Sequence, residues 1–325
     1  MSTEATQTAS ASRVAHFPIT FFAIGMGMMG LTLALRAAET SFAHGHAVSQ
    51  AVLVVSVLML LAVSVGYILK AMRHPEEVAA EWNHPVRIAF FPAISISLLL
   101  LATALLETAP SLATPVWMVA TALQGVLALS VLSAWIGHRP FQFSSMTPAW
   151  FIPAVGNVIV PLAGARLGYV EISWLFFSAG LIFWVMLLTL VMNRLMFHDP
   201  LPGKMLPTMM ILVAPPAVAF TAWTRMVEEP GAFGHFLLSV AYVFALLVAT
   251  QAPKFRQLPF AMSWWALSFP LAALSIASFG YAHASGSEPH LWIGAGLLVL
   301  LIAVVALLIL RTAQAMRAGK VCVPE

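Results

Sequence analysis

The feature that most constrains this chain is a series of ten apolar stretches, each about as long as a bilayer is thick. A helix needs about 20 mostly apolar residues to cross the hydrocarbon core. The stretches cover residues 17–37, 47–70, 87–107, 114–136, 149–166, 170–194, 205–224, 232–251, 260–282 and 291–313. Their apolar runs are continuous rather than alternating, which excludes a membrane β-barrel. We therefore predict an all-α polytopic membrane protein with ten transmembrane helices, of which the fifth is the shortest.

Composition excludes the soluble classes of protein. Of the 325 residues, 61% are apolar and only 8% are charged, whereas about a quarter of the residues in a soluble domain are charged. Cys322 is the only cysteine, so a disulfide scaffold is also excluded. We interpret the isoelectric point near 9.3 as basic loops on one side of a membrane, and expect no nucleic-acid partner.

The distribution of basic residues predicts the orientation. Ten spans place both termini on one side, and with that side cytoplasmic, 12 of the 15 Lys and Arg residues are cytoplasmic. The other three basic residues, Arg36, Arg166 and Arg225, then lie outside. We expect the charged residues near span ends to reach the membrane interface; these are Arg36, Glu39, Glu107 and Arg166. We predict a short cytoplasmic tail (1–15), a single membrane domain (16–313) and a C-terminal cytoplasmic tail (314–325).

Prolines divide the spans into two classes. The odd spans carry them near or within the apolar run, and we expect the even spans to have no interior proline. An interior proline removes a backbone hydrogen bond and kinks the helix, which is tolerated in lipid only where protein or a cavity satisfies the freed carbonyl. We predict five helical hairpins, starting near residues 17, 87, 149, 205 and 260, in a ring with the kinked odd helices inside. The prolines are Pro18, Pro92, Pro153, Pro161, Pro215, Pro216 and Pro270.

Small residues are frequent on the odd spans, for example in the run Gly25, Met26, Gly27 of the first. They allow either close packing of helices or a narrow path along the axis. Because five inner helices share the trend, we favour the axial path.

Groups that usually carry chemistry are absent from the span centres. No charged residue lies near a midpoint, where a proton-coupled transporter normally needs a carboxylate. The histidines lie in loops or at span ends; His44 and His46 are a weak metal signal, and we expect no metal, no cofactor and no enzyme activity. An uncharged path holds its solute weakly, and helix N-termini favour anions, so the sequence indicates a channel-like conduit.

Two segments have a distinctive sequence: residues 264–272 (Trp-Trp-Ala-Leu-Ser-Phe-Pro-Leu-Ala) and residues 152–157 (Ile-Pro-Ala-Val-Gly-Asn). They resemble the ninth-helix signature and the fifth-helix motif of one family, the plant slow-type anion channels and the bacterial tellurite-resistance TehA proteins. Residues 84–87 resemble the entry to the third helix, 214–217 the seventh, and 22–27 the first, with Ala23 in place of a glycine. The resemblance covers about residues 17–313 and includes every odd span.

This resemblance implies five hairpins around a pore, a homotrimer with one pore per subunit, and a phenylalanine gate at Phe269. The alternative for Phe269 is an ordinary packed aromatic. The pore-lining residues we expect are Phe22, Gly25, Gly27, Pro92, Ser95, Pro153, Gly156, Asn157, Pro215, Pro216, Ser268 and Pro270.

The predicted function is a passive channel of the bacterial inner membrane for small monovalent anions such as chloride or nitrate, surrounded by membrane lipid. We prefer monovalent anions because the sequence shows no cluster of buried Arg or Lys that would bind a dianion tightly. One alternative is a secondary transporter or exporter of dicarboxylate, sulfite or tellurite-related oxyanions. Another is a membrane-embedded enzyme or receptor.

Overall fold

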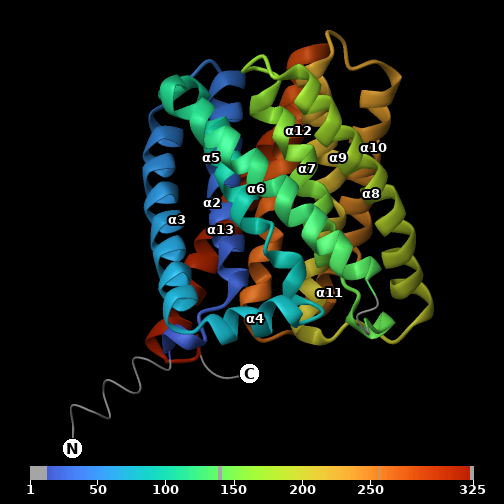
Figure 1. The fold of residues 1–325 in the computed structure, drawn as a ribbon. Helices are drawn as coiled ribbons and strands as arrows, with labels where there is room; N and C mark the ends of the chain where they lie inside the picture. The colour runs from blue at the N-terminus through green and yellow to red at the C-terminus, as the bar shows by residue number, and fades with distance from the viewer. Residues whose placement is uncertain (1–12, 138–140, 256, 323–325) are drawn as a thin grey trace, which may run out of the picture.

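The computed structural model describes residues 13–137, 141–255 and 257–322, and these residues form an all-helical bundle (Figure 1). Within these described ranges, nine helical segments are long and apolar enough to cross a membrane, and a tenth, Pro148–Gly164, is shorter. This confirms the predicted fold class and the short fifth span. The main helices are α2 (Phe22–Ser41), α3 (Ala47–Arg73), α5 (Ala93–Thr108), α6 (Pro110–Ile136), α7 (Phe151–Gly164), α8 (Val170–Phe197), α9 (Ala214–Met226), α10 (Gly231–Ala249), α12 (Ser268–Ser285) and α13 (Glu288–Arg317).

Five of these helices form a closed inner ring. Helix α2 contacts α5, α5 contacts α7, α7 contacts α9, α9 contacts α12, and α12 returns to α2. Each inner helix also packs against the outer helix that follows it in the chain, in the pairs α2–α3, α5–α6, α7–α8, α9–α10 and α12–α13. The fold is therefore five hairpins in a ring, with the odd spans inside as predicted.

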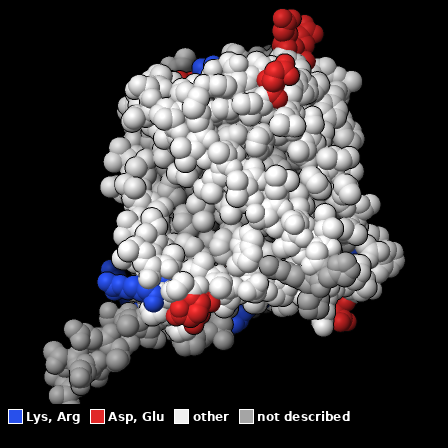
Figure 2. Space-filling view, in the orientation of Figure 1, with Lys and Arg blue, Asp and Glu red and all other residues white. Residues whose placement is uncertain are grey.

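Burial separates the inner and outer helices sharply. In the four longer inner spans, 72–78% of the most apolar stretch is buried, against 22–28% in the outer spans. The outer helices leave large apolar side chains exposed, such as Leu58 (60%), Leu129 (68%) and Leu246 (69%). Figure 2 shows that Lys, Arg, Asp and Glu on the visible face lie at the two ends of the molecule and leave a white belt between them. Such a belt suits hydrocarbon, so the outer helices face lipid.

Each inner span begins with a 3₁₀ segment that passes into the α-helix. These segments are η1 (Ile19–Phe21), η2 (Arg87–Phe90), η4 (Pro148–Trp150), η5 (Gly203–Leu212) and η6 (Met262–Leu267). All lie at the end of the bundle that holds both termini, which we call the termini end; the opposite end is the far end (Figure 1).

Prolines mark the junctions between the 3₁₀ segments and the helices. Pro92 caps α5, Pro215 and Pro216 lie in the first turn of α9, and Pro153 and Pro270 are the third residues of α7 and α12. In a first turn the missing N–H has no helical partner to lose. These prolines therefore serve as starts of the α portion rather than as breaks inside it.

The expectation that even spans have no interior proline is wrong at Pro115. Helix α6 begins at Pro110, earlier than the predicted span, so Pro115 lies in its second turn. The ring of Pro115 is exposed on the outer side of the bundle. Because Pro115 lies near the start of α6, it interrupts the backbone hydrogen bonds only close to the beginning of that outer helix.

Shorter elements and the tails complete the described chain. Two short helices that were not predicted, α4 (Pro75–Asn83) and α11 (Ala252–Phe255), lie in loops at the termini end. Helix α13 continues to Arg317, into the predicted tail 314–325, and most of the predicted N-terminal tail 1–15 lies outside the described residues.

A buried ion pair fastens α4 to the first two spans. Lys70 of α3 and Glu81 of α4 are each 2% exposed, and their Nζ and Oε2 atoms are 2.9 Å apart. Glu81 also accepts hydrogen bonds from the Tyr67 hydroxyl and the Ile19 backbone N–H, each at 3.0 Å. Lys70 in turn donates to the Phe17 carbonyl at 3.0 Å. The start of the first inner span is thereby held in place by charge as well as packing.

Candidate functional site: an apolar cavity inside the ring

The inner ring surrounds a small apolar cavity. All five inner spans contribute to its wall, and every contributing residue belongs to the first half of its span. In the part of the chain that the structure describes, no charged side chain lines the cavity. Its lining residues are Ala23, Met26, Phe90, Ile152, Val155, Ile211, Ala214, Trp265, Ala266, Phe269 and Pro270.

Phe269 lies in this cavity at the first turn of α12. Its side chain is in the wall and the residue is 6% exposed, with Pro270 next to it. Gly30 of α2 lies directly beside it: a Cβ at Gly30 would be 3.4 Å from Cδ2 of Phe269 and 2.9 Å from Cβ of Ala272. The absence of a side chain at Gly30 therefore lets α2 approach α12 at the level of Phe269.

Of the twelve expected pore-lining residues, Pro270 is in the cavity wall. The small residues among the others make contacts between helices. A Cβ at Gly25 would be 3.0 Å from Oγ of Ser97, one at Gly27 would be 2.2 Å from Oγ of Ser268, and one at Gly156 would be 2.4 Å from the Gln124 amide. These contacts account for their small size by close packing, and their pore-lining role stays a prediction.

The remaining expected residues lie between helices or at helix starts. Phe22 packs edge-on against Tyr67 of α3, with ring centroids 5.8 Å apart. Ser268 donates to the Trp265 carbonyl at 2.6 Å. The prolines at the junctions, Pro92, Pro153, Pro215 and Pro216, were described above.

A polar cluster that sequence reasoning missed joins three helices around Gln124. From the outer helix α6, its Nε2 donates to the Pro153 carbonyl (3.1 Å) and to Oδ1 of Asn157 (3.0 Å). Its Oε1 accepts from the Ser95 hydroxyl at 2.7 Å. Gln124 thus satisfies polar groups of two inner helices from outside the ring. A glutamine in the middle of an apolar span is the signal that could have revealed it, because such a group needs partners in lipid.

Two of the charged side chains that we expected at the membrane interface, Arg36 and Glu39, are buried in the structure. Arg36 and Glu39 are only 7% and 8% exposed, which corrects the expectation that they reach the interface. Glu39 accepts hydrogen bonds from the backbone N–H groups of Val48 and Ser49 (3.0 and 3.1 Å), which lie in the first turn of α3. A carboxylate satisfies such free N–H groups well. Glu39 therefore acts as a cap within the protein.

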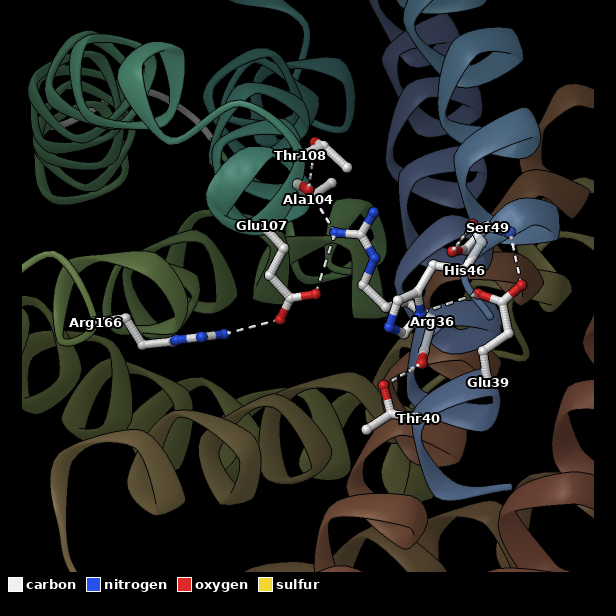
Figure 3. A network of polar contacts seen from close by, with 9 residues as sticks. All are labelled: Arg36, Glu39, Thr40, His46, Ser49, Ala104, Glu107, Thr108 and Arg166. Atoms are coloured by element: carbon white, nitrogen blue, oxygen red, sulfur yellow. Dashed lines mark hydrogen bonds and ion pairs between the residues drawn. The ribbon is translucent and has the colours of Figure 1, made fainter. Parts of the chain in front are cut away.

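Arg36 lies between two inner helices at the far end. Its Nη1 donates to the Ala104 carbonyl of α5 at 2.6 Å and lies 3.9 Å from Oε2 of Glu107. Glu107 in turn accepts from Nη1 of Arg166 at 3.3 Å (Figure 3). The other two nitrogens of Arg36, Nε and Nη2, are buried and have no hydrogen-bond partner among the described residues.

Metal-binding and nucleophilic groups are sparse. Over the ranges that the structure describes, no three His, Cys, Asp or Glu residues gather into a group that could hold a metal. His46 instead lies 3.4 Å from Oε2 of Glu39. Burial raises the pKa of the Cys322 thiol, although Arg13 and Lys70 counteract part of the rise. Cys322 is therefore a weak nucleophile at neutral pH.

Within the described residues, ten helical spans, nine of them long enough to cross a membrane, close around an uncharged cavity, which is the architecture of an integral membrane protein. Residues 16–313 match the sequence model of the SLAC1 family, described as voltage-dependent anion channel. The chain belongs to this family, as the motifs on its odd spans indicate.

Individual relatives agree with the family. The chain is 30% identical to the S-type anion channel SLAH2 of Arabidopsis thaliana over 82% of its own length and 53% of that protein. It is 25% identical to the guard cell S-type anion channel SLAC1 of the same plant, over 84% of this chain and 51% of the relative. The tellurite resistance protein TehA homolog of Haemophilus influenzae is 27% identical over 82% of this chain and 81% of the relative. The chain spans about half the length of the plant relatives.

Proposed function

We propose that this protein conducts small monovalent anions such as chloride or nitrate passively through the axis of its ring, and that Phe269 is the gate. The observation that carries the proposal is the position of Phe269 in an apolar cavity to which all five inner spans contribute. An aromatic ring in a narrow apolar passage blocks ions by its size and by excluding water. The family and the plant relatives, which are anion channels, support the choice of ion.

The helix ends also support anions over cations. Five inner α-helices begin at about the level of the cavity, each after its 3₁₀ segment. A helix N-terminus carries a partial positive charge, so five of them around one passage favour a negative ion. Because no carboxylate lines the cavity, a passing anion meets no opposing charge there.

The test is the current carried by the Phe269→Ala variant in planar bilayers. We expect the variant to carry a large anion current where the unchanged protein carries little. Replacing chloride by gluconate should remove most of this current, and exchanging sodium for potassium should leave it unchanged. Phe279→Ala is the matched control: Phe279 is buried (2%) on the same helix but packs against Gly294 and Phe42, away from the cavity. Equal currents for both variants would refute the gate.

The second candidate function is a secondary transporter or exporter, which would move its solute along the same path by coupled transport rather than by passive flow. The relative from Haemophilus influenzae is described as a tellurite resistance protein homolog, which favours an exporter of tellurite-related oxyanions, sulfite or dicarboxylate. A carrier gives saturable flux and small currents, whereas an open channel gives large currents. Flux of labelled chloride and of sulfite into liposomes, compared with the current, separates the two functions.

The proposal also covers the membrane in which the protein lies, its orientation and its oligomeric state. We place it in the bacterial inner membrane with both termini in the cytoplasm, because 12 of 15 basic residues then lie inside. We also propose a homotrimer with one pore per subunit. Mass measurement in detergent tests the trimer, and labelling of cysteines introduced at the two ends tests the orientation.

A further inference from the structure

Arg36 is a buried cation whose hydrogen bonds are incomplete. Its side chain is 9% exposed, yet only Nη1 has a hydrogen-bond acceptor, the Ala104 carbonyl. The Nε and Nη2 atoms are buried and unpartnered among the described residues. Buried donors on a charged group are costly to leave unpaired, and each one calls for an explanation. Two adjacent N–H groups of one guanidinium form the fork that binds a small anion.

The neighbours of Arg36 add positive charge. Arg166 follows α7 and Arg225 lies in the last turn of α9, so three of the inner spans carry an arginine near the far end, Arg36 being the one that lies within its helix. Arg225 is within electrostatic range of both Arg166 and Glu107. Glu107 of α5 is the acid of this group, and three positive charges against one negative leave an excess of two. These four residues, Arg36, Glu107, Arg166 and Arg225, we call the far-end charge cluster.

Glu107 lies between two arginines and makes a hydrogen bond to Arg166 and a longer contact to Arg36. Its Oε2 is 3.9 Å from Arg36 and its Oε1 is 3.3 Å from Arg166, and its side chain is 44% exposed. Figure 3 shows the carboxylate between the Arg36 and Arg166 guanidinium groups. Exposed ion pairs of this length contribute little to stability. Among the described residues Glu39 makes no ion pair with Arg36: its Oε1 caps α3, and its Oε2 lies 3.4 Å from Nδ1 of His46.

We propose that the far-end charge cluster is a binding site for a small monovalent anion such as chloride or nitrate. Arg36 supplies the Nε–H and Nη2–H donors, Arg166 and Arg225 supply charge, and Glu107 moves aside when the anion binds. The inference deepens the proposed function and rests on it: the cluster concentrates the permeant anion at the far end of the path, where inner helices end. Glu107 sets the affinity, since it holds the arginines when no anion is present.

The test measures chloride binding without relying on conduction. The full chain in detergent is unfolded by heat and followed by tryptophan fluorescence, while chloride replaces gluconate at constant ionic strength. We expect chloride to raise the unfolding temperature. In Glu107→Gln the half-effective chloride concentration should fall about two- to fivefold, the range that loss of one exposed ion pair allows. In Arg36→Lys, which keeps the charge but loses the fork, the chloride-dependent rise should disappear.

Two variants outside the cluster serve as controls. Arg311→Lys changes an exposed arginine of α13, and Glu229→Gln an exposed acid of the α9–α10 loop; both should respond to chloride as the unchanged protein does. The proposal is overturned if Arg36→Lys keeps the full chloride response, or if neither chloride nor nitrate raises the unfolding temperature of the unchanged protein and of Glu107→Gln.

Currents separate this inference from the proposed function. An anion current in Phe269→Ala whose concentration dependence is the same after Arg36→Lys is added overturns the site and leaves the channel. Loss of chloride binding in Arg36→Lys, with no anion current in Phe269→Ala, supports the site and refutes the channel.

Discussion

Replacing Glu81 by glutamine should destabilise the protein more than any other single loss of charge at the termini end. In the native structure the Glu81 carboxylate accepts from three donors, at 2.9 Å from Lys70 and 3.0 Å from both Tyr67 and the Ile19 N–H. A glutamine side chain offers one acceptor oxygen, and its NH₂ group faces donors. Whichever way the amide is oriented, at least one of the three donors loses its acceptor, and the Lys70 ammonium, 2% exposed, loses its counter-charge.

The magnitude follows from the distance and the burial. At 2.9 Å, with an effective dielectric constant of about 20, the attraction between Lys70 and Glu81 is about 6 kcal/mol. Part of this attraction offsets the loss of hydration on burial, so removing one partner from a buried pair costs about 3–5 kcal/mol. Removing both partners, as in Lys70→Met with Glu81→Gln, should recover at least about 2 kcal/mol of that loss.

The assay is unfolding by dodecyl sulfate in mixed micelles, followed by tryptophan fluorescence. Glu76→Gln on the same helix is the control, because that side chain is 67% exposed and pairs only with His74; its free energy of unfolding should change by less than about 0.5 kcal/mol. If Glu81→Gln also changes it by less than about 1 kcal/mol, or if the double variant shows no recovery, the pair does not fasten α4 to the ring as argued.

Two further predictions concern packing and reactivity. Gly164→Ala should lower the free energy of unfolding by about 1–3 kcal/mol, because the new Cβ would be 2.6 Å from the Trp117 ring. Gly296→Ala, with no atom within 4 Å, should raise it by up to about 1 kcal/mol through helix propensity, and a reversed order in dodecyl sulfate unfolding would contradict the packing argument. Because burial raises the pKa of Cys322, the native chain holds less thiolate at pH 7 than the unfolded chain. Maleimide should therefore label native Cys322 more slowly, with a rate that rises as pH increases toward 9; equal rates for native and unfolded protein would exclude the burial.

The ring itself was predictable because its causes are visible in the sequence. Lipid requires continuous apolar helices, so ten runs of suitable length predict ten spans. The prolines of the odd spans then distinguish the inner from the outer helices. Pro115 shows the limit of the rule: a proline is also tolerated near the end of an outer helix, where few backbone bonds are at stake.

The details of the inner spans were not predictable from the sequence pattern. A proline predicts a missing hydrogen bond, but it does not show whether a kink or a change from 3₁₀ to α-helix results. Pro92 and Pro216 lie at such changes. A glycine likewise shows that something approaches closely, without showing what: the space at Gly156 is filled by Gln124, which no local pattern connects to it.

Most of the remaining features that the sequence did not predict depend on contacts between residues far apart in the chain. The Ile19 N–H and Glu81 are 62 residues apart, and Arg36 and Ala104 are 68 apart. Without knowledge of these pairs, charges near span ends are expected to reach the interface. The structure instead buries Arg36 and Glu39 inside the protein, and the candidate site at Arg36 was missed for this reason.

The 3₁₀ segments change the number of residues that an inner span needs to cover a given length along its axis. An α-helix rises about 1.5 Å per residue and a 3₁₀ helix about 2.0 Å. The 28 residues of α8 therefore extend about 42 Å. The next span reaches nearly the same length, about 40 Å, with ten residues of η5 and 13 of α9. Stretching the first part of an inner span lets fewer residues match the thickness that its outer neighbour covers, so the inner and outer helices can end level without equal numbers of residues.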